Sequence, residues 1–545
     1  MKKTKLLSLF TLVIAMMFVA CSSKDDYLSA LPAQPFALSK VNVGNLITKS
    51  QVLEDAQVKG LLKKGINELS GDSRILLREV LENPDKTGLD FSRDVYFVME
   101  NFEQQIGLIL FAVKDVDALK NMIKTLLADS EFNSNLTLAS VEDINTIEDR
   151  KGNAVAAFDA SKFVIAIAEK SNADALEYMK ADNKESTRSD KLNDFISSES
   201  DVSVFIDYEQ IMRFVINSIP EMTEFNIEDF KDASLSMALN FEPGRVVANA
   251  HYQGFGKFNK IYDEIIQVPN KDLLSYIPNN SYVVGNAGIK DLAKFIKLLP
   301  EIYVNQANKQ MDEFNNRIAQ MDTLNTQGKN NNIKMKWELL NSLNGGIVVA
   351  VTPSIPSANQ SEPQFMVVAE CKDSKLFDFI EMLMKLDGNQ KPEVAKNVYA
   401  LGLNKKIDWD NHVWGEDFKY ILKGYDYYLG YVDNKIFVMP ENFYRNPLNA
   451  LSNNFATNSL SSKIKDKYAF VVDVPAIIND LEQNIGNERV NDKILLKNFR
   501  KIENVTFEFD GTNSEFVVNL ADKENNALKQ IKDFVISLAI AEAVD

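Results

Sequence analysis

The chain has 545 residues, 45% of them hydrophobic and 25% charged, which is typical of a globular protein with a large core and excludes a disordered chain. Its formal charge of −17 gives a surface that repels nucleic acid and anionic headgroups, so we expect no nucleic-acid partner. The length predicts more than one domain, and two cysteines are too few for a disulfide-stapled fold.

The first twenty residues have the pattern of an export signal. Three lysines within Met1–Lys5 precede an apolar run, Leu6–Ala20, that ends in a small residue. A membrane-spanning helix needs about 20 apolar residues, so this shorter run predicts a cleaved signal peptide and not a permanent span. Without those lysines, 57 basic side chains face 77 acidic ones, a formal charge of −20.

The end of the apolar run predicts a lipid anchor. Phe18-Val19-Ala20-Cys21 resembles the lipobox of bacterial lipoproteins, in which the cysteine is lipidated and becomes the first mature residue. The alternative is an ordinary secreted protein cut after Ala20. Because each buried lipid CH₂ contributes about 0.8 kcal/mol, several acyl chains on Cys21 would hold the chain firmly at a membrane.

The residues after Cys21 bear on the location. Ser22–Asp26 is similar to the short acidic stretches that direct lipoproteins of Bacteroidetes to the outer face of the outer membrane. We therefore expect a lipid-anchored protein of the outer membrane, exposed at the cell surface. The alternative is that these residues form only a solvated tether, on the periplasmic face, because a short run of charges is usually a solvated segment without a sorting role.

Hydrophobic periodicity predicts an α+β fold of two related halves, each with two β-α-β-β-α modules around mostly antiparallel sheets. The elements expected in the first half are a strand at 36–43, helices at 46–70 and 74–82, a hairpin of 94–100 with 106–113, a helix at 116–127, a hairpin of 151–158 with 162–168, a strand at 204–208, a hairpin of 235–241 with 245–252, and a helix at 255–266. Asn42 and Asp207 are expected to cap helices, because short polar side chains accept hydrogen bonds from the first free amides.

The second half repeats this order of elements. An internal repeat matters because overlooking it leads to a wrong prediction of the whole fold. Lys114-Asp115 is matched by Lys372-Asp373, and Asp207 by Asp473, which is also expected to be a helix cap. The final helix is expected from Asn525 to about Ala541. The domain plan is a signal peptide at 1–20, a lipidated tether at 21–33, a first α+β half at 34–270 and a second at 271–545.

The arrangement resembles a known family. The residues that carry the resemblance are Leu31-Pro32-Ala33, the passage Pro84–Asp90 ahead of Val95-Tyr96-Phe97-Val98, and the later Val-Asp strands. They are similar to the Bacteroidetes lipoproteins grouped as domain of unknown function 4836. The resemblance implies an exported outer-membrane lipoprotein and brings no catalytic residues with it.

The sequence contains none of the common catalytic motifs. It has no phosphate-binding glycine loop, no dinucleotide-binding glycine pattern, no His-Glu-x-x-His and no Gly-x-Ser-x-Gly. His251 and His412 lie in different halves, which leaves little material for a histidine-based zinc site or a serine triad. We expect no cofactor and a protein that is not an enzyme. Cys371 lies in an apolar run and is expected to be a small buried side chain.

One acidic and aromatic stretch stands out as a candidate ligand or cation site. Its members are Asp408, Trp409, Asp410, His412, Trp414, Glu416 and Asp417, followed by Tyr420, Tyr425, Tyr427, Tyr428 and Tyr431. The carboxylates could bind calcium, although Gly415 does not fit an EF-hand loop. The aromatic faces could bind a glycan, or the tyrosines could simply fill a sheet core.

Two functions are compatible with these observations. The first is a non-enzymatic envelope or surface protein that binds a protein or glycan partner or has a structural role. The second is a glycan-active or cation-dependent hydrolase that uses the cluster at 408–431, although nothing in the sequence fixes the carboxylate separation that such chemistry needs.

Asp408→Ala and Asp410→Ala test the cluster. If it is a site, each variant should fold normally and bind cation or glycan about tenfold more weakly or worse, because a charged ligand group is lost. Calorimetric titration with calcium and with glycans measures this. Unchanged folding together with unchanged binding would show that the cluster is neither a cation site nor a glycan site.

Overall fold

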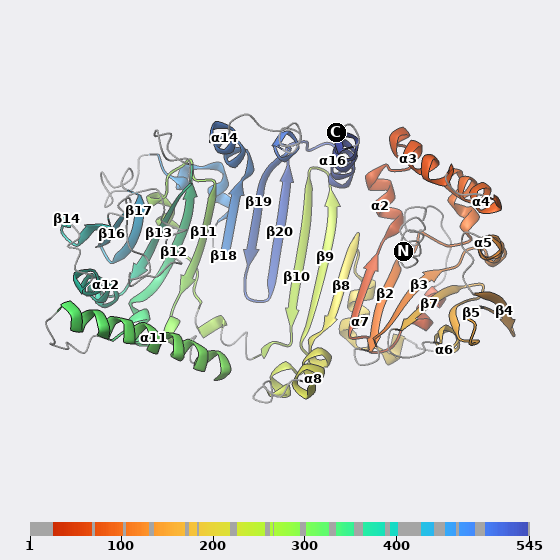
Figure 1. The fold of residues 1–545 in the computed structure, drawn as a ribbon, viewed down its shortest axis with the longest axis horizontal. Coiled ribbons are helices and arrows are strands. Elements are labelled where there is room, and N and C mark those ends of the chain that lie inside the picture. Colours follow the sequence, from red (N-terminus) through yellow and green to blue (C-terminus); the bar gives the residue numbers. More distant parts are fainter. Residues whose placement is uncertain are drawn as a thin grey trace. The chain divides into compact units, whose positions relative to one another are not determined.

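The computed structural model describes residues 25–67, 71–101, 105–129, 136–168, 174–181, 185–218, 226–256, 262–264, 266–294, 301–325, 334–353, 363–386, 393–401, 427–440, 453–464, 468–484 and 496–542. The chain forms two compact units. One consists of Met1–Phe255 with Asp522–Asp545, and the other of Gly256–Ala521. Each unit is an α+β body built on an antiparallel sheet, which confirms the predicted fold class (Figure 1).

The sheet of the first unit has the strand order β10-β9-β8-β1-β2-β3-β7-β6-β5-β4, with every neighbouring pair antiparallel. The strands are β1 (Ala37–Val41), β2 (Val95–Asn101), β3 (Ile106–Ala112), β4 (Thr137–Val141), β5 (Ile144–Glu148), β6 (Ala154–Phe158), β7 (Lys162–Ala168), β8 (Val202–Asp207), β9 (Ser234–Glu242) and β10 (Arg245–Gln253).

The helices of the first unit lie between these strands and after the last one. They are η1 (Asp25–Ala30), α2 (Val43–Ser50), α3 (Ala56–Asn67), α4 (Gly71–Glu82), η2 (Pro84–Thr87), α5 (Val116–Ala128), α6 (Ala175–Lys180), η3 (Glu185–Thr187), α7 (Asp190–Ser197), α8 (Tyr208–Ser218), η5 (Ile227–Phe230) and α16 (Ala527–Glu542).

Buried side chains cover both faces of the first unit's sheet around β2 and β3. In β2, Tyr96 and Val98 belong to a buried cluster with residues of η1, α6 and α7. Val95 points to the opposite face and packs in a second cluster with Leu119 and Ile123 of α5. Successive strand residues point to opposite faces, so a strand that is apolar at both parities needs cover on both sides.

The sheet of the second unit has the order β20-β19-β18-β11-β12-β13-β17-β16-β15-β14, again antiparallel throughout. The strands are β11 (Val283–Ile289), β12 (Leu343–Thr352), β13 (Gln364–Cys371), β14 (Glu393–Ala395), β15 (Val398–Ala400), β16 (Tyr427–Val432), β17 (Lys435–Pro440), β18 (Tyr468–Asp473), β19 (Ile502–Phe509) and β20 (Asn513–Leu520). The helices are η6 (Lys271–Tyr276), α11 (Glu301–Asn325), η7 (Trp337–Ser342), α12 (Lys375–Leu386), η10 (Phe455–Thr457), η11 (Ser459–Lys463) and α14 (Val474–Asn484).

The predicted helix caps are confirmed. The Asn42 side chain accepts a hydrogen bond from the Asn45 amide at the start of α2, at 2.8 Å. Asp207 and Asp473 do the same at the starts of α8 and α14, with N···O distances of 3.1 and 3.0 Å. Each cap therefore fixes where a strand gives way to a helix.

The predicted single helix over 46–70 is wrong, because the structure has two helices there. The first, α2, ends where Gln51 adopts a left-handed backbone conformation with φ of 53°. Its amide donates to the Ile47 carbonyl, which terminates the helix, and α3 begins beyond the turn. Periodicity continued through the break and did not reveal it.

The predicted tether, 21–33, extends too far along the chain. Residues from Asp25 onward form η1, in which Tyr27 is buried and its hydroxyl donates to the Asp94 carbonyl at 3.2 Å. Leu31, just after η1, is 0% exposed. These apolar residues belong to the core of the first unit, so the folded body begins almost directly after the predicted anchor.

The last helix belongs to the first unit, although the domain plan placed it in a second half at 271–545. The ammonium of Lys532 in α16 lies 2.7 Å from the Asp55 carboxylate, and both side chains are mostly buried. The hydrogen bond from Lys532 lowers the pKa of the Asp55 carboxyl. Periodicity predicts that such a helix has an apolar face but not which unit covers that face.

Gly88 and Gly60 form a matched pair for testing this fold. Gly88 follows η2 with φ of +75°, and an added methyl group would overlap the Asp115 carbonyl and the Leu119 amide. We expect Gly88→Ala to lower the free energy of unfolding by about 3 kcal/mol. Gly60 lies within α3, and a methyl group added there would have no atom within 4 Å, so Gly60→Ala should raise stability by about 0.5–1 kcal/mol.

Urea-induced unfolding, monitored by circular dichroism, measures both changes. The wild-type chain is the reference. A Gly88→Ala protein as stable as the wild type would contradict the close packing of this turn against α5.

Candidate functional site

The predicted ligand or cation site lies outside the described residues. This holds for Asp408, Trp409, Asp410, His412, Trp414, Glu416 and Asp417, and for Tyr420 and Tyr425. Cys21, the predicted lipidation site, also lies outside them. These assignments stay predictions from the sequence.

Two of the tyrosines that follow the cluster, Tyr427 and Tyr428, are described and contribute to the core. Tyr427 and Tyr428 in β16 are 1% and 8% exposed. The Tyr427 hydroxyl accepts a hydrogen bond from the Phe365 amide at 3.2 Å, and its carbonyl accepts one from the Leu401 amide at 2.8 Å. These two rings therefore pack inside the second unit and present no aromatic face to a ligand.

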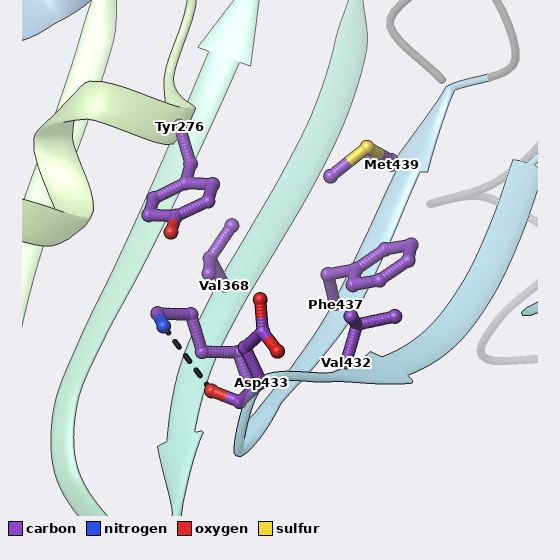
Figure 2. A pocket seen from close by; sticks show the side chains of 7 residues that line it. Tyr276, Val368, Val432, Asp433, Phe437 and Met439 are labelled. Atoms are coloured by element: carbon purple, nitrogen blue, oxygen red, sulfur yellow. Dashed lines mark hydrogen bonds between the residues drawn. The ribbon is translucent and has the colours of Figure 1, made fainter. Parts of the chain in front are cut away.

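A small depression lies on the second unit, over β13 and β17. Figure 2 shows Tyr276 and Val368 on one side of it and Val432 and Phe437 on the other. The ammonium of Lys435 lies 5.4 Å from the centre of the Tyr276 ring. The free volume is about 10 Å³, enough for about one water molecule, whereas ligand pockets usually measure about 300–1,000 Å³.

The most unusual polar group of the first unit is Lys40 in β1. Its side chain is 1% exposed, and its ammonium donates to the carbonyls of Phe195 at 3.3 Å and Ile196 at 3.1 Å. It also donates to the carbonyl of Ser198, and it lies 4.0 Å from the Asp94 carboxylate. The ammonium therefore binds the last carbonyls of α7, where a helix has free acceptors and a partial negative charge.

Burial shifts the pKa values of both Lys40 and Asp94. Burial lowers the pKa of the Lys40 ammonium, while the charges of Asp94 and Glu199 act in the opposite direction. Burial also raises the pKa of the Asp94 carboxyl, against the charge of Lys40. In both cases the low-polarity surroundings disfavour the charged form more than the partner stabilises it. Lys40 is enclosed on the face that contains Leu38, so we assign it a structural role.

A second ion pair, in which the carboxylate is buried, fixes the start of β8. The Asp201 carboxylate is 1% exposed and accepts hydrogen bonds from the Lys49 ammonium at 2.6 and 2.7 Å. It also accepts one from the Phe241 amide in β9 at 2.7 Å. One carboxylate thus links α2 to the β8–β9 ladder, and removing one partner would leave a buried charge uncompensated.

The sequence contained a signal for Lys40 that periodicity reasoning missed. In β1, Leu38 and Lys40 are two residues apart and therefore lie on the same face of the strand. A lysine in register with a buried leucine indicates either a strand end or a buried ammonium with carbonyl partners. Nothing local marked Asp201, because its partners Lys49 and Phe241 are distant in the sequence.

Cys371 is 4% exposed, which confirms the expectation of a buried side chain. Burial raises the pKa of its thiol to about 11. Within the described part of the chain, no three His, Cys, Asp or Glu side chains come together as a possible metal site. Likewise, no described helix has the length and apolar character needed to cross a membrane.

In the part of the chain that the structure describes, each of the two units has an antiparallel ladder of ten strands, so the protein belongs to the α+β class. A family model, described as domain of unknown function DUF4836, matches residues 27–528, and the chain belongs to this family. No curated protein matches the sequence.

Two solved structures are similar to part of the chain, crystal forms IV and III of the protein TP0453. Form IV has a TM-score of 0.26 and 11% identity, covering 44% of this chain and 84% of its own. Form III has a TM-score of 0.26 and 10% identity, covering 46% and 90%. Likeness at this level supports no conclusion about fold or function.

The Cys371 thiol should resist alkylation in the folded protein. At pH 8 a thiol with a pKa of about 11 is almost entirely protonated, and its burial blocks the reagent. Iodoacetamide labelling followed by mass spectrometry should be slow in buffer and fast in urea. Equal rates in both conditions would contradict this assignment.

Proposed function

We propose that this chain is a lipid-anchored protein of the bacterial outer membrane, exposed at the cell surface, that acts as a binding or structural protein and not as an enzyme. The support begins with the sequence of the first 26 residues, where a short apolar run ends in Ala20-Cys21 and an acidic stretch follows. Membership of the DUF4836 family is compatible with this proposal and adds no activity.

The observation that carries the proposal is the short distance between the predicted anchor and the folded body. Three residues, Ser22–Lys24, separate Cys21 from Asp25, where η1 begins. Extended residues span at most about 3.6 Å each, so Cys21 and Asp25 are separated by about 14 Å at most. A lipid on Cys21 would therefore hold the first unit close to the bilayer surface.

The start of the body is firmly attached, which makes this distance meaningful. Tyr27 and Leu31 are buried in the core of the first unit. The Ser29 hydroxyl lies 2.8 Å from the Lys162 ammonium in β7. Because η1 cannot move away from the sheet without exposing these apolar side chains, the anchor restrains the whole unit and not merely a loose end.

We also propose that the two units arose by duplication, as the sequence pattern suggests. Their strand orders correspond strand for strand, β1 with β11 through β10 with β20. Contacts outside the ladders correspond as well. The amides of Asp207 and Asp473 donate to the carbonyls of Phe36 and Tyr282, at 2.8 and 2.7 Å.

A second pair of contacts supports the same relationship. The Val113 amide donates to the Ser161 carbonyl at 2.9 Å, and the Cys371 amide to the Asn434 carbonyl at 2.7 Å. The first joins the end of β3 to the tip of the β6–β7 hairpin, and the second joins the end of β13 to the tip of the β16–β17 hairpin. A doubled scaffold offers two versions of each edge and loop, of which one can diverge to bind a partner while the other keeps a structural role.

The alternative function, a glycan-active or cation-dependent hydrolase, depends on Asp408, Asp410, Glu416 and Asp417. It is tested by the Asp408→Ala and Asp410→Ala variants described above.

Cys21→Ala tests the anchor. The wild-type protein should separate into the detergent phase of Triton X-114 and show the added mass of a lipid by mass spectrometry. Cys21→Ala should remain in the aqueous phase without that mass. Cys371→Ala is the matched control and should behave as the wild type, because its thiol is buried in the second unit.

The face of the membrane is tested on intact cells. A protease added from outside should cleave the wild-type protein if the body is surface-exposed. Resistance on intact cells with cleavage after lysis would place the body on the periplasmic face. Lipid-free wild-type protein in the aqueous phase would contradict the anchoring proposal altogether.

A further inference from the structure

The strand β4 ends the first unit's sheet on one side. Figure 1 shows it as the outermost arrow beyond β5. Among the residues that the structure describes, β5 is the strand with which β4 pairs, over five residues without a register shift. Thr137, Ser140 and Val141 are exposed. Leu138 is partly buried against the cluster that contains Leu119 and Ile123 of α5.

The hairpin geometry shows which backbone groups of β4 face outward. Val141 and Ile144 are paired across the two-residue turn Glu142-Asp143, so they exchange hydrogen bonds with each other. Hydrogen-bonded and non-hydrogen-bonded pairs alternate along an antiparallel ladder. The amide and carbonyl groups of Leu138 and Ser140 therefore point away from β5, toward the open edge.

Within its described residues, β4 lacks the charges, prolines and bulges that usually protect an edge strand from pairing with another chain. The sequence of β4, Thr-Leu-Ala-Ser-Val, contains no charge and no proline, and its ladder has no bulge. Such edges are open to strand addition, and proteins normally block them with charges, short strands, prolines or bulges.

The corresponding edge of the second unit is protected. Its outermost strand, β14, has only three residues, all of them exposed, and it contains Glu393. The ladder with β15 is irregular between Glu393 and Ala395. Two units with the same strand order therefore differ at the same edge, and the open one is β4.

We propose that β4 binds an extended segment of another protein by strand addition, and that this segment is uncharged or positively charged. Backbone hydrogen bonds to Leu138 and Ser140 would supply affinity, and alternate side chains would lie over the cluster that contains Leu138. Glu142 and Asp143 are exposed at one end of β4 and favour a basic residue at that end of the partner.

The charge of the chain argues against a second copy as the partner. Two chains that each have a strongly negative formal charge, −17 with the signal peptide and −20 without it, repel each other, and pairing β4 with itself would bring two acidic turns into one small interface. This inference rests on the proposed binding role and deepens it by naming a surface and a class of partner. The Cys21 experiments remain separate, because binding at β4 is measured on purified full-length chain whether or not it is lipidated.

Ser140→Pro and Ser140→Ala form a matched pair for the test. Proline removes the outward amide of Ser140 and is tolerated at a sheet edge, where it breaks no bond to β5. Both variants lose the hydroxyl that donates to Asn145 at 3.0 Å, so the alanine variant controls for that loss. Hydrogen exchange at Ala139 and Val141 checks that β4 still pairs with β5.

The probe is a fluorescent peptide of alternating valine and threonine with a lysine at each end. Its binding to the protein is measured by fluorescence anisotropy. We expect saturable binding to wild type and Ser140→Ala, and binding about tenfold weaker to Ser140→Pro. A peptide N-methylated along one edge, and a peptide with glutamate in place of lysine, should each bind about tenfold more weakly to wild type.

Equal binding to the proline and alanine variants would overturn the proposal, as would the absence of saturable binding to the wild type. Analytical sedimentation of the protein without peptide tests whether a second copy of the chain binds to β4. A dimer that Ser140→Pro dissociates and Ser140→Ala does not would show that the partner of β4 is a second copy, which also overturns the proposal.

Discussion

The antiparallel hydrogen-bonded ladder is the constraint on which the rest of each unit depends. Its register decides which residues face each other on neighbouring strands, and a slip of one residue would move every side chain of a strand to the opposite face of the sheet. In the first unit, Val204, Ser39 and Phe97 form one such cross-strand row. Phe470, Gly285 and Val349 form a row in the second unit. The register also aligns the ends of the strands, and the helices that begin at these ends take their positions from it.

A shared register also shows how the two units differ at single positions. Lys40 faces Ser203 in the first unit, and Asn286 faces Ala469 in the second, at the corresponding point of the ladder. Lys40 reaches the carbonyls at the end of α7. Asn286 is also buried, and its side chain accepts a hydrogen bond from the Ala469 amide at 3.2 Å. Both solutions satisfy a polar group on a buried strand face, and the first ties the sheet to the end of a helix.

Local chemistry in the sequence was enough to predict the features that depend on neighbouring residues. Asn42, Asp207 and Asp473 cap helices because their side chains need only reach an amide three residues on. The β4–β5 hairpin was not predicted, since its turn, Glu142-Asp143, lacks the glycine or asparagine that usually marks a two-residue turn. Glu142 adopts φ of 56° there without such a residue.

Features that depend on distant residues were not available to sequence reasoning. The attachment of α16 to the first unit rests on Lys532 and Asp55, which are separated by nearly the whole chain. The enclosed Lys40 depends on carbonyls of α7 in the same way. The candidate cluster at 408–417 was chosen on composition alone, and composition does not determine whether carboxylates converge. Tyr427 and Tyr428 illustrate this, because they are aromatic, close to the cluster in sequence, and buried in the core.

Recognition by this scaffold is restricted by how fully its sheets are covered. Where clusters fill both faces of the first unit's sheet, as they do around β2 and β3, a ligand cannot lie on a face without displacing packed side chains. The backbone at a sheet edge is different, because its outward amides and carbonyls already need a partner or water. Strand addition uses these groups without disturbing the core. A scaffold with one blocked edge and one open edge can therefore acquire a binding function while its packing, and hence its stability, stays the same.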